Sequence, residues 1–111
     1  MNQASREVCI LNQRGLHARA SARFVNLASE IDAAIEVEKD GHKVCGTSIM
    51  GLMMLGAGVG DTITIHVEGD YADEALAKLV SLVEERFGEE LVVRAYLDVL
   101  ANLGSAVPEG R

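Results

Sequence analysis

Two segments of alternating polarity constrain the fold of this chain more than any other feature. They are residues 33–38, with Ile35 and Val37 on one side, and residues 61–67, with Ile63 and Ile65 on one side. A period of two residues predicts β-strands with one buried face and one solvated face. A sheet built from such strands needs a second layer that covers only its apolar face.

Three segments have the helical spacing that supplies this layer. The first covers residues 17–29, where Arg19, Arg23 and Asn26 are expected to face water. The second is a short helix over residues 48–55, with Thr47 as its expected cap. The third begins with Asp70 as its N-cap and ends at Gly88. Its inner stripe is Leu76, Leu79, Val80, Val83 and Phe87.

The remaining strands complete the order of elements. Residues 7–12 are expected to form a buried first strand, and residues 42–46 a strand that returns from the Asp40-Gly41 hairpin turn. The resulting order, β-α-β-β-α-β-α, predicts an α+β fold. We expect an open-faced two-layer sandwich, in which three helices cover one face of a four-stranded antiparallel sheet.

We expect one domain over residues 1–90 and a C-terminal extension over residues 91–111. The extension has apolar residues at helical spacing and a polar end. A short helix or a disordered tail is the simpler interpretation, and an interaction element is the alternative.

Charge is distributed unevenly along the chain. The net charge of −7 argues against nucleic acid as a partner. Residues 8–29 hold three of the ten basic residues and none of the seventeen acidic ones, so this window carries +3 and the rest −10. A basic window in an acidic chain indicates a site for a small anion or an acidic partner surface.

The hexapeptide Gly15-Leu16-His17-Ala18-Arg19-Ala20 lies inside this window, where the first strand ends and the first helix begins. The free N–H groups of a helix N-terminus favour an anion, and the Arg19 guanidinium adds a fork of donors. A neutral imidazole at His17 is nucleophilic near pH 7. These features predict that His17 holds a phosphate or becomes phosphorylated.

With these residues, the chain resembles the histidine-containing phosphocarrier (HPr) family of the bacterial phosphoenolpyruvate-dependent phosphotransferase system. Gly15-Leu16-His17-Ala18-Arg19-Ala20-Ser21-Ala22 matches the family's active-site motif. A second motif matches over residues 47–55, and the resemblance covers roughly residues 5–90.

The resemblance implies that His17 accepts a phosphoryl group on Nδ1 from phosphorylated enzyme I and gives it to a histidine of an enzyme IIA domain. Arg19 and the backbone N–H groups of Ala18 and Arg19 would steady the phosphate. Gly15 would let the loop approach beneath the imidazole. The chain would then be a carrier with a phosphohistidine intermediate, not a turnover enzyme.

Ser48 matches the family's regulatory serine, which a dedicated HPr kinase/phosphorylase modifies in some members. The alternative is ordinary capping chemistry in the first turn of a helix. Thr47 stands where many relatives carry a lysine.

The partner-binding surface is expected on the first two helices. Ile49, Met50 and Met53 form one stripe of the short helix, opposite Leu52 and Leu55. We expect this stripe to stay exposed and to dock partners, because methionine side chains adapt to several surfaces. Ala22 and Arg23 are assigned to the same surface.

Two alternatives stay open. Ala18 and Ala20 stand where sugar-transport members usually carry Thr or Ser and Pro, so the chain looks more like the regulatory, nitrogen-linked branch than the sugar-transport branch. In the other alternative, the chain is a noncovalent anion-binding regulatory module on a similar α+β fold, with His17 and Arg19 holding the anion.

Other residues carry weaker signals. Cys9 and Cys45 are expected to be buried free thiols, and His42 and His66 to face solvent. None of these has metal-ligand spacing, and the glycines of residues 56–60 do not open a helix as a dinucleotide loop does. We expect no cofactor or metal, no membrane span, no secretory signal, a cytoplasmic location and a monomer.

Overall fold

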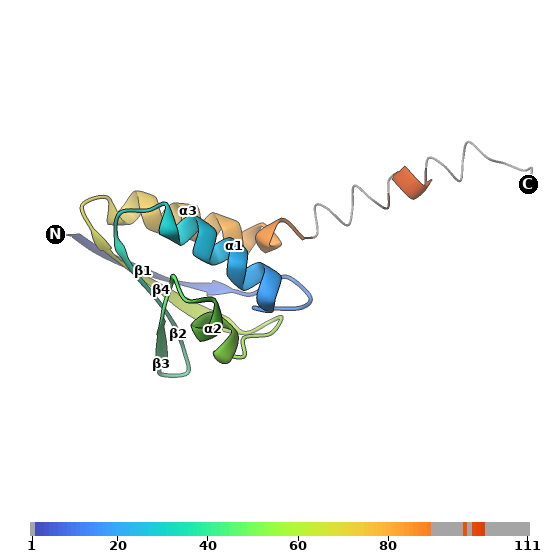
Figure 1. Ribbon diagram of the computed structural model, residues 1–111, viewed down its shortest axis with the longest axis horizontal. Coiled ribbons are helices and arrows are strands. Elements are labelled where there is room, and N and C mark those ends of the chain that lie inside the picture. The colour runs from blue at the N-terminus through green and yellow to red at the C-terminus, as the bar shows by residue number, and fades with distance from the viewer. Residues whose placement is uncertain (1, 90–96, 98, 102–111) are drawn as a thin grey trace, which may run out of the picture.

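A four-stranded antiparallel sheet with strand order β1-β4-β2-β3 forms one layer of the computed structural model, which describes residues 2–89, 97 and 99–101. Helices α1 and α3 lie side by side on one face, and α2 packs beside α1 (Figure 1). This arrangement confirms the predicted open-faced sandwich. The elements are β1 (Asn2–Cys9), α1 (Ala18–Ser29), β2 (Ala34–Lys39), β3 (His42–Cys45), α2 (Ile49–Met54), β4 (Thr62–Gly69), α3 (Ala72–Glu84) and the 3₁₀ turn η1 (Arg86–Gly88).

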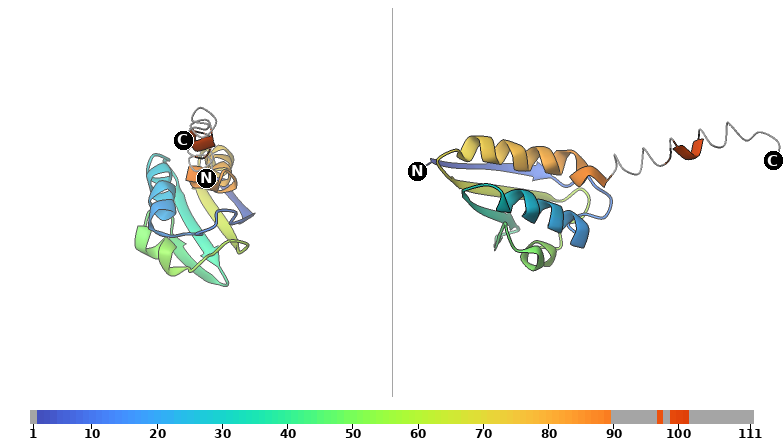
Figure 2. Two further views of the ribbon diagram at one scale, coloured as in Figure 1. Left: turned by 90° about the vertical axis from the view of Figure 1, so that its right-hand side faces the viewer. Right: turned by 45° about the horizontal axis from the view of Figure 1, so that its top comes forward.

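The core lies between the sheet and the helices, the two layers that Figure 2 shows end-on in its left view. The alternating positions of β2 and β4 supply its lower half, with Val37 and Ile65 fully buried. Phe24 of α1 and Leu79 of α3 close it from above. Each such side chain contributes roughly 1.5–3 kcal/mol through removal of apolar surface from water. The predicted inward faces of both strands are therefore confirmed.

The hairpin between β2 and β3 also follows the sequence. Asp40 and Gly41 have φ values of 51° and 82°, the pair of positive angles that a two-residue I′ turn requires. The turn sets the register in which Lys39 pairs with His42 and Glu36 with Cys45.

The first strand differs from its prediction. Strand β1 begins at Asn2 and is mostly exposed, whereas a buried strand over residues 7–12 was expected. It lies at the edge of the sheet and pairs with β4 from Asn2–Gly69 to Cys9–Thr62. Ladder hydrogen bonds to β4 hold the polar N-terminal residues in the strand, although their side chains favour no strand.

Cys9 and Cys45 are both free thiols, as the sequence predicted. Both are exposed, however, whereas the sequence predicted that they would be buried. Their neighbours Val8 and Val44 point toward the helices, so alternation turns Cys9 and Cys45 to the open face. Strand register has outweighed the general preference of cysteine for the interior.

The ends of the two later helices also need correction. Ser48, not Thr47, is the N-cap of α2, because the Ser48 hydroxyl accepts from the Gly51 N–H. The Thr47 hydroxyl instead contacts the Cys45 sulfur at 3.0 Å. Helix α3 starts after Tyr71, which makes no side-chain cap, whereas Asp70 was predicted to cap it. Two acidic residues in the first turn of α3, Asp73 and Glu74, complement the helix dipole there.

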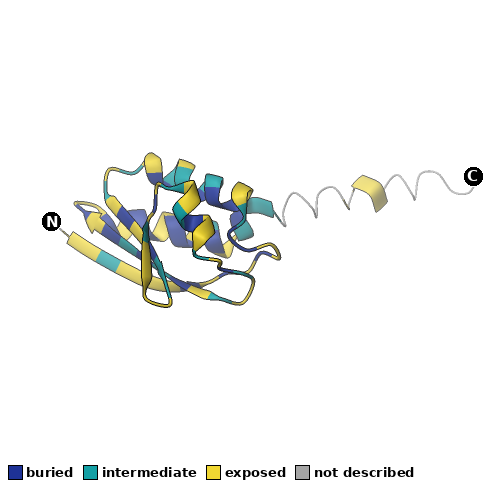
Figure 3. Cartoon of the chain, turned by 60° about the horizontal axis from the view of Figure 1, so that its bottom comes forward, coloured by how far each residue is buried: buried dark blue, intermediate teal, exposed yellow. Residues whose placement is uncertain are grey.

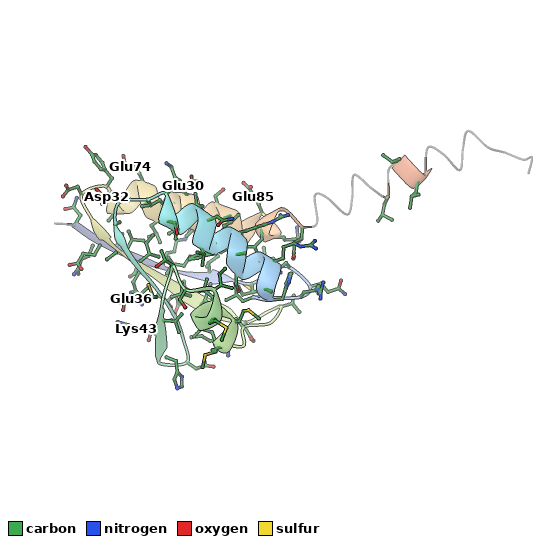
Figure 4. The ribbon with its side chains drawn as sticks, in the orientation of Figure 1. Glu30, Asp32, Glu36, Lys43, Glu74 and Glu85 are labelled. Atoms are coloured by element: carbon green, nitrogen blue, oxygen red, sulfur yellow. The ribbon has the colours of Figure 1, made fainter. Side chains whose placement is uncertain are left out.

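The face of the sheet that no helix covers carries exposed polar side chains such as Gln3, Glu36 and Glu68. Figure 3 shows many exposed residues along the strands. His66 was expected to face solvent but is half-buried, with Nε2 2.8 Å from Oε1 of Glu38 on the neighbouring strand. His42 is exposed, as predicted. Figure 4 shows Glu30, Asp32 and Glu74 toward the end of the molecule where α1 ends, away from the start of α1 that His17 caps.

The extension predicted for residues 91–111 falls almost wholly outside the described residues. Of its apolar side chains, Leu97, Val99 and Leu100 are described, and all three are exposed.

Candidate functional site

His17 is the N-cap of α1. Its backbone is extended, with φ −76° and ψ −178°, and its Nδ1 atom accepts a hydrogen bond of 3.3 Å from the backbone N–H of Arg19. The imidazole thus satisfies one of the free donors at the helix start, a task that Ser or Asp usually performs. The predicted position of His17 at the helix N-terminus is confirmed.

Gly15 makes the loop before α1 possible. Its φ is +63°, and a Cβ atom there would lie 2.3 Å from the carbonyl oxygen of Ala57. The next residue, Leu16, donates its N–H to that oxygen at 2.9 Å. The loop before α1 is therefore packed directly on the backbone of the loop after α2, at a distance that only glycine permits.

The other side of the His17 ring meets a residue that the sequence did not predict. Oε2 of Glu89 contacts Nε2 of His17, and both side chains are largely shielded from solvent. Residues 8–29 include no acidic residue, but in the folded protein Glu89 lies against this window. A glutamate 72 residues away along the chain carries no pattern from which this contact could be predicted.

Asn12 holds the Glu89 carboxylate in place. The buried Asn12 amide donates through Nδ2 to Oε1 of Glu89 at 3.0 Å and to the carbonyl oxygen of Gly15 at 2.8 Å. Both partners only accept, which fixes the orientation of the amide. Asn12 was predicted only as the end of the first strand, so its role in this network is new.

The turn before Glu89 directs it toward His17. Arg86, Phe87 and Gly88 have φ values of 58°, 54° and 76°, so the right-handed helix of α3 is interrupted before Glu89. The turn is anchored by the buried Phe87 ring and by Arg23, whose Nη1 donates to the Phe87 carbonyl oxygen. Arg23 was expected to face water, but this contact half-buries it. Gly88 was expected to end α3 itself; it ends the following 3₁₀ turn instead.

Arg19 and Ala18 occupy the first turn of α1, and both are exposed. The Arg19 backbone N–H is bound to His17, whereas its side chain stands on the solvent side of the helix start. An anion placed at His17 Nδ1 would meet these backbone donors and the positive end of the helix dipole.

The second motif builds the start of α2. Ser48 has an extended backbone, and its Oγ accepts a hydrogen bond of 3.0 Å from the N–H of Gly51. This is the capping role that the sequence left open as an alternative. The hydroxyl is only half-buried.

The predicted stripe of α2 is exposed. Met50 is 70% exposed, with Ile49 and Met53 near 40%, whereas Leu52 on the opposite side is fully buried. Met54, which was not assigned to the stripe, is 80% exposed. Because α2 packs against α1, these side chains lie beside the helix that carries Ala22 and the His17 cap. Ala22 is half-buried.

Neither a metal centre nor a membrane segment is found in the described part of the chain. Among residues 2–89, 97 and 99–101, no group of three or more His, Cys, Asp or Glu side chains is arranged to hold a metal ion. No helix in the same residues has the length and apolar character needed to cross a membrane.

The sequence matches one protein-family model. That model is described as "PTS HPr component phosphorylation site", and it matches residues 4–85. The matched range contains both motifs, and it ends four residues before Glu89.

Individual phosphocarrier proteins are also similar to this chain. Phosphocarrier protein HPr of Cupriavidus necator is 43% identical over 76% of this chain and 94% of its own length. Phosphocarrier protein NPr of Shewanella violacea is also 43% identical, over 80% of this chain and 98% of its own. Among solved structures, HPr of Bacillus anthracis matches with a TM-score of 0.71 and 42% identity, covering 75% of this chain and 99% of that one.

Proposed function

Because the chain belongs to the HPr family of phosphotransferase-system phosphocarriers, we propose that it carries a phosphoryl group on Nδ1 of His17. It accepts the group from phosphorylated enzyme I and passes it to a histidine of an enzyme IIA domain. It is a covalent intermediate carrier, not a turnover catalyst, and it acts in the cytoplasm as a monomer.

The observation that carries this proposal is the placement of Nδ1 at the start of α1. Nδ1 accepts one weak hydrogen bond, 3.3 Å from the Arg19 N–H. When Nδ1 bonds to phosphorus, that N–H and its neighbour at Ala18 are free to donate to phosphate oxygens. Arg19 adds a mobile guanidinium that follows the phosphate as it arrives and leaves.

Enzyme I and the enzyme IIA domain dock on the exposed stripe beside His17. Ile49, Met50 and Met53 supply flexible apolar contacts, and Ala22 extends the surface onto α1. Arg23 contributes less directly than its assignment to this surface suggests. Its guanidinium is already committed to the Phe87 carbonyl oxygen.

Ser48 is the regulatory position, modified by an HPr kinase/phosphorylase. A phosphate on the Ser48 hydroxyl is favoured locally, because it sits at the N-terminus of α2. It also places two negative charges next to the apolar docking stripe. The modification therefore weakens partner docking without unfolding α2.

Of the two branches, we propose the nitrogen-linked one. The HPr of Cupriavidus necator and the NPr of Shewanella violacea are both 43% identical to this chain, so sequence identity favours neither branch. The branch rests on Ala18 and Ala20, at positions where sugar-transport members usually carry Thr or Ser and Pro. Transfer rates to nitrogen-type and sugar-type enzyme IIA domains, measured side by side, decide it.

The test is covalent labelling. The chain is incubated with phosphoenolpyruvate and enzyme I, and intact mass is measured before and after brief acid treatment. One acid-labile phosphate is expected on the wild type and none on His17→Ala. If the wild type binds inorganic phosphate but gains no covalent mass, the alternative of a noncovalent anion-binding module is correct.

A further inference from the structure

We propose that Glu89 is a positioning residue for phosphoryl transfer: it holds the His17 proton on Nε2 and so keeps Nδ1 as the nucleophile. The proposal rests on the proposed function of His17. It assigns a role to a residue outside both motifs and outside the matched range of residues 4–85.

The contacts of the His17 ring specify one tautomer. A neutral imidazole has one N–H donor and one acceptor nitrogen. The Glu89 carboxylate only accepts, so Nε2 must carry the proton at the Nε2–Oε2 contact. On the other side, Nδ1 accepts from the Arg19 N–H at 3.3 Å. Two partners from distant parts of the chain therefore require the same state, Nε2–H with a lone pair on Nδ1.

The Glu89 carboxylate is held, not loosely placed. Oε1 accepts from the buried Asn12 amide at 3.0 Å, so each carboxylate oxygen has its own partner. Arg23 fixes the turn before Glu89 through the Phe87 carbonyl oxygen. Positive φ angles at two non-glycine residues of this turn, Arg86 and Phe87, are unfavourable by themselves. Such a turn persists only where the surrounding contacts maintain it.

The same proton serves both transfer steps. In the first, the Nδ1 lone pair attacks phosphorus, the bond from phosphorus to the donor histidine breaks, and its electron pair stays on the donor ring. The Nε2 proton does not move, so the phosphorylated His17 ring is a cation paired with Glu89. In the second, the phosphorus–Nδ1 bond breaks, its electron pair returns to Nδ1, and the neutral Nε2–H imidazole is restored. No proton need enter or leave in either step.

A purely structural role is the competing explanation, in which Glu89 only fastens the end of the domain to Asn12. Both roles predict some loss of stability when Glu89 is removed. Only the positioning role predicts a change in the protonation of the His17 ring. The experiment therefore needs a spectroscopic readout as well as a rate.

The variants are Glu89→Ala and Glu89→Gln, with Glu74→Gln, exposed in the first turn of α3, as a matched loss of charge. In each full-length protein, ¹⁵N NMR of the ring nitrogens measures the ratio of the two neutral tautomers. Phosphorylation of His17 by phosphorylated enzyme I is measured by quenched flow, and thermal unfolding controls for stability.

In Glu89→Ala, the share of the Nδ1–H form is expected to rise about tenfold. The rate of His17 phosphorylation is expected to fall about tenfold, because the cationic phosphorylated ring also loses its hydrogen bond to a charged group. Glu89→Gln retains an acceptor oxygen but no charge, so it should keep the tautomer and lose part of the rate. Glu74→Gln should match the wild type in both.

An unchanged tautomer ratio in Glu89→Ala overturns the proposal. So does an unchanged transfer rate in a variant whose ratio has shifted. If the wild type accepts no phosphate from enzyme I, the function proposed for His17 fails, and the positioning role fails with it. The NMR measurement on the unmodified protein then still decides whether Glu89 holds the proton.

Discussion

The backbone N–H of Leu16 donates a hydrogen bond of 2.9 Å to the carbonyl oxygen of Ala57, which ties the loop before α1 to the loop after α2. The His17 cap and the exposed stripe of α2 are thereby held in one arrangement. The close approach depends on Gly15, the residue before Leu16.

Gly15→Ala is expected to lower the free energy of unfolding by about 2–4 kcal/mol, measured by urea denaturation. The added Cβ would lie 2.3 Å from the Ala57 oxygen, on a backbone with φ +63°. Gly58→Ala is the control, because its Cβ meets nothing closer than an Asp61 oxygen at 3.9 Å. Equal effects of the two substitutions would contradict this account of the loop.

Ser48→Ala should cost about 1 kcal/mol of stability, because the Gly51 N–H loses its cap. Ser48→Asp should restore most of that stability while slowing transfer from enzyme I, because its charge stands beside the docking stripe. Thermal unfolding and transfer rates are measured on both. If Thr47→Ala destabilises α2 more than Ser48→Ala does, the assignment of the cap to Ser48 is wrong.

Met50→Gln and Met53→Gln are expected to raise the KM for phospho-enzyme I about tenfold each, since they remove apolar contacts from the docking surface. Stability should change by less than about 0.5 kcal/mol, because Met50 is 70% exposed and Met53 41%. Tyr71→Gln is the control, an equally exposed apolar residue at the start of α3. An unchanged KM in both methionine variants would show that the stripe does not contact enzyme I.

Cys45 should be the more reactive of the two cysteines. The Thr47 hydroxyl, and then its backbone, hydrogen-bond the thiolate and lower the Cys45 pKa from its usual value. At about pH 7.5 a lower pKa leaves a larger fraction of Cys45 as the reactive thiolate. Iodoacetamide should therefore label Cys45 faster than the exposed Cys9 at this pH. Thr47→Val should raise the Cys45 pKa and slow the labelling of Cys45. Equal labelling rates of Cys45 in Thr47→Val and the wild type would show that the Thr47 hydroxyl does not lower this pKa.

The parts of the structure that depend on local pattern could be predicted. Alternation at Ile35, Val37, Ile63 and Ile65 defined the buried face of the sheet, and the Asp40-Gly41 turn defined the hairpin. The cap at His17 is local too, because it depends on the residues on either side of it. The sequence does not show which strand lies at the edge of the sheet. The predicted extent and burial of β1 were therefore wrong.

The contact of Glu89 with His17 could not be predicted from the sequence. Glu89 reaches His17 through a turn in which Arg86 and Phe87 adopt positive φ, and nothing in those residue types favours that conformation. The turn exists because Phe87 is buried and Arg23 binds its carbonyl oxygen. These contacts join α1 to the turn after α3, which are distant in the sequence, so no local pattern encodes them.

The central claim is that Nδ1 of His17 is the atom that carries the phosphoryl group. The direct measurement is ³¹P–¹⁵N NMR of the ¹⁵N-labelled chain after phosphorylation by enzyme I and phosphoenolpyruvate. Coupling of phosphorus to Nδ1 of His17 is predicted, with the proton retained on Nε2. Coupling to Nε2, the nitrogen that faces Glu89, or a phosphate on any other side chain would contradict the account.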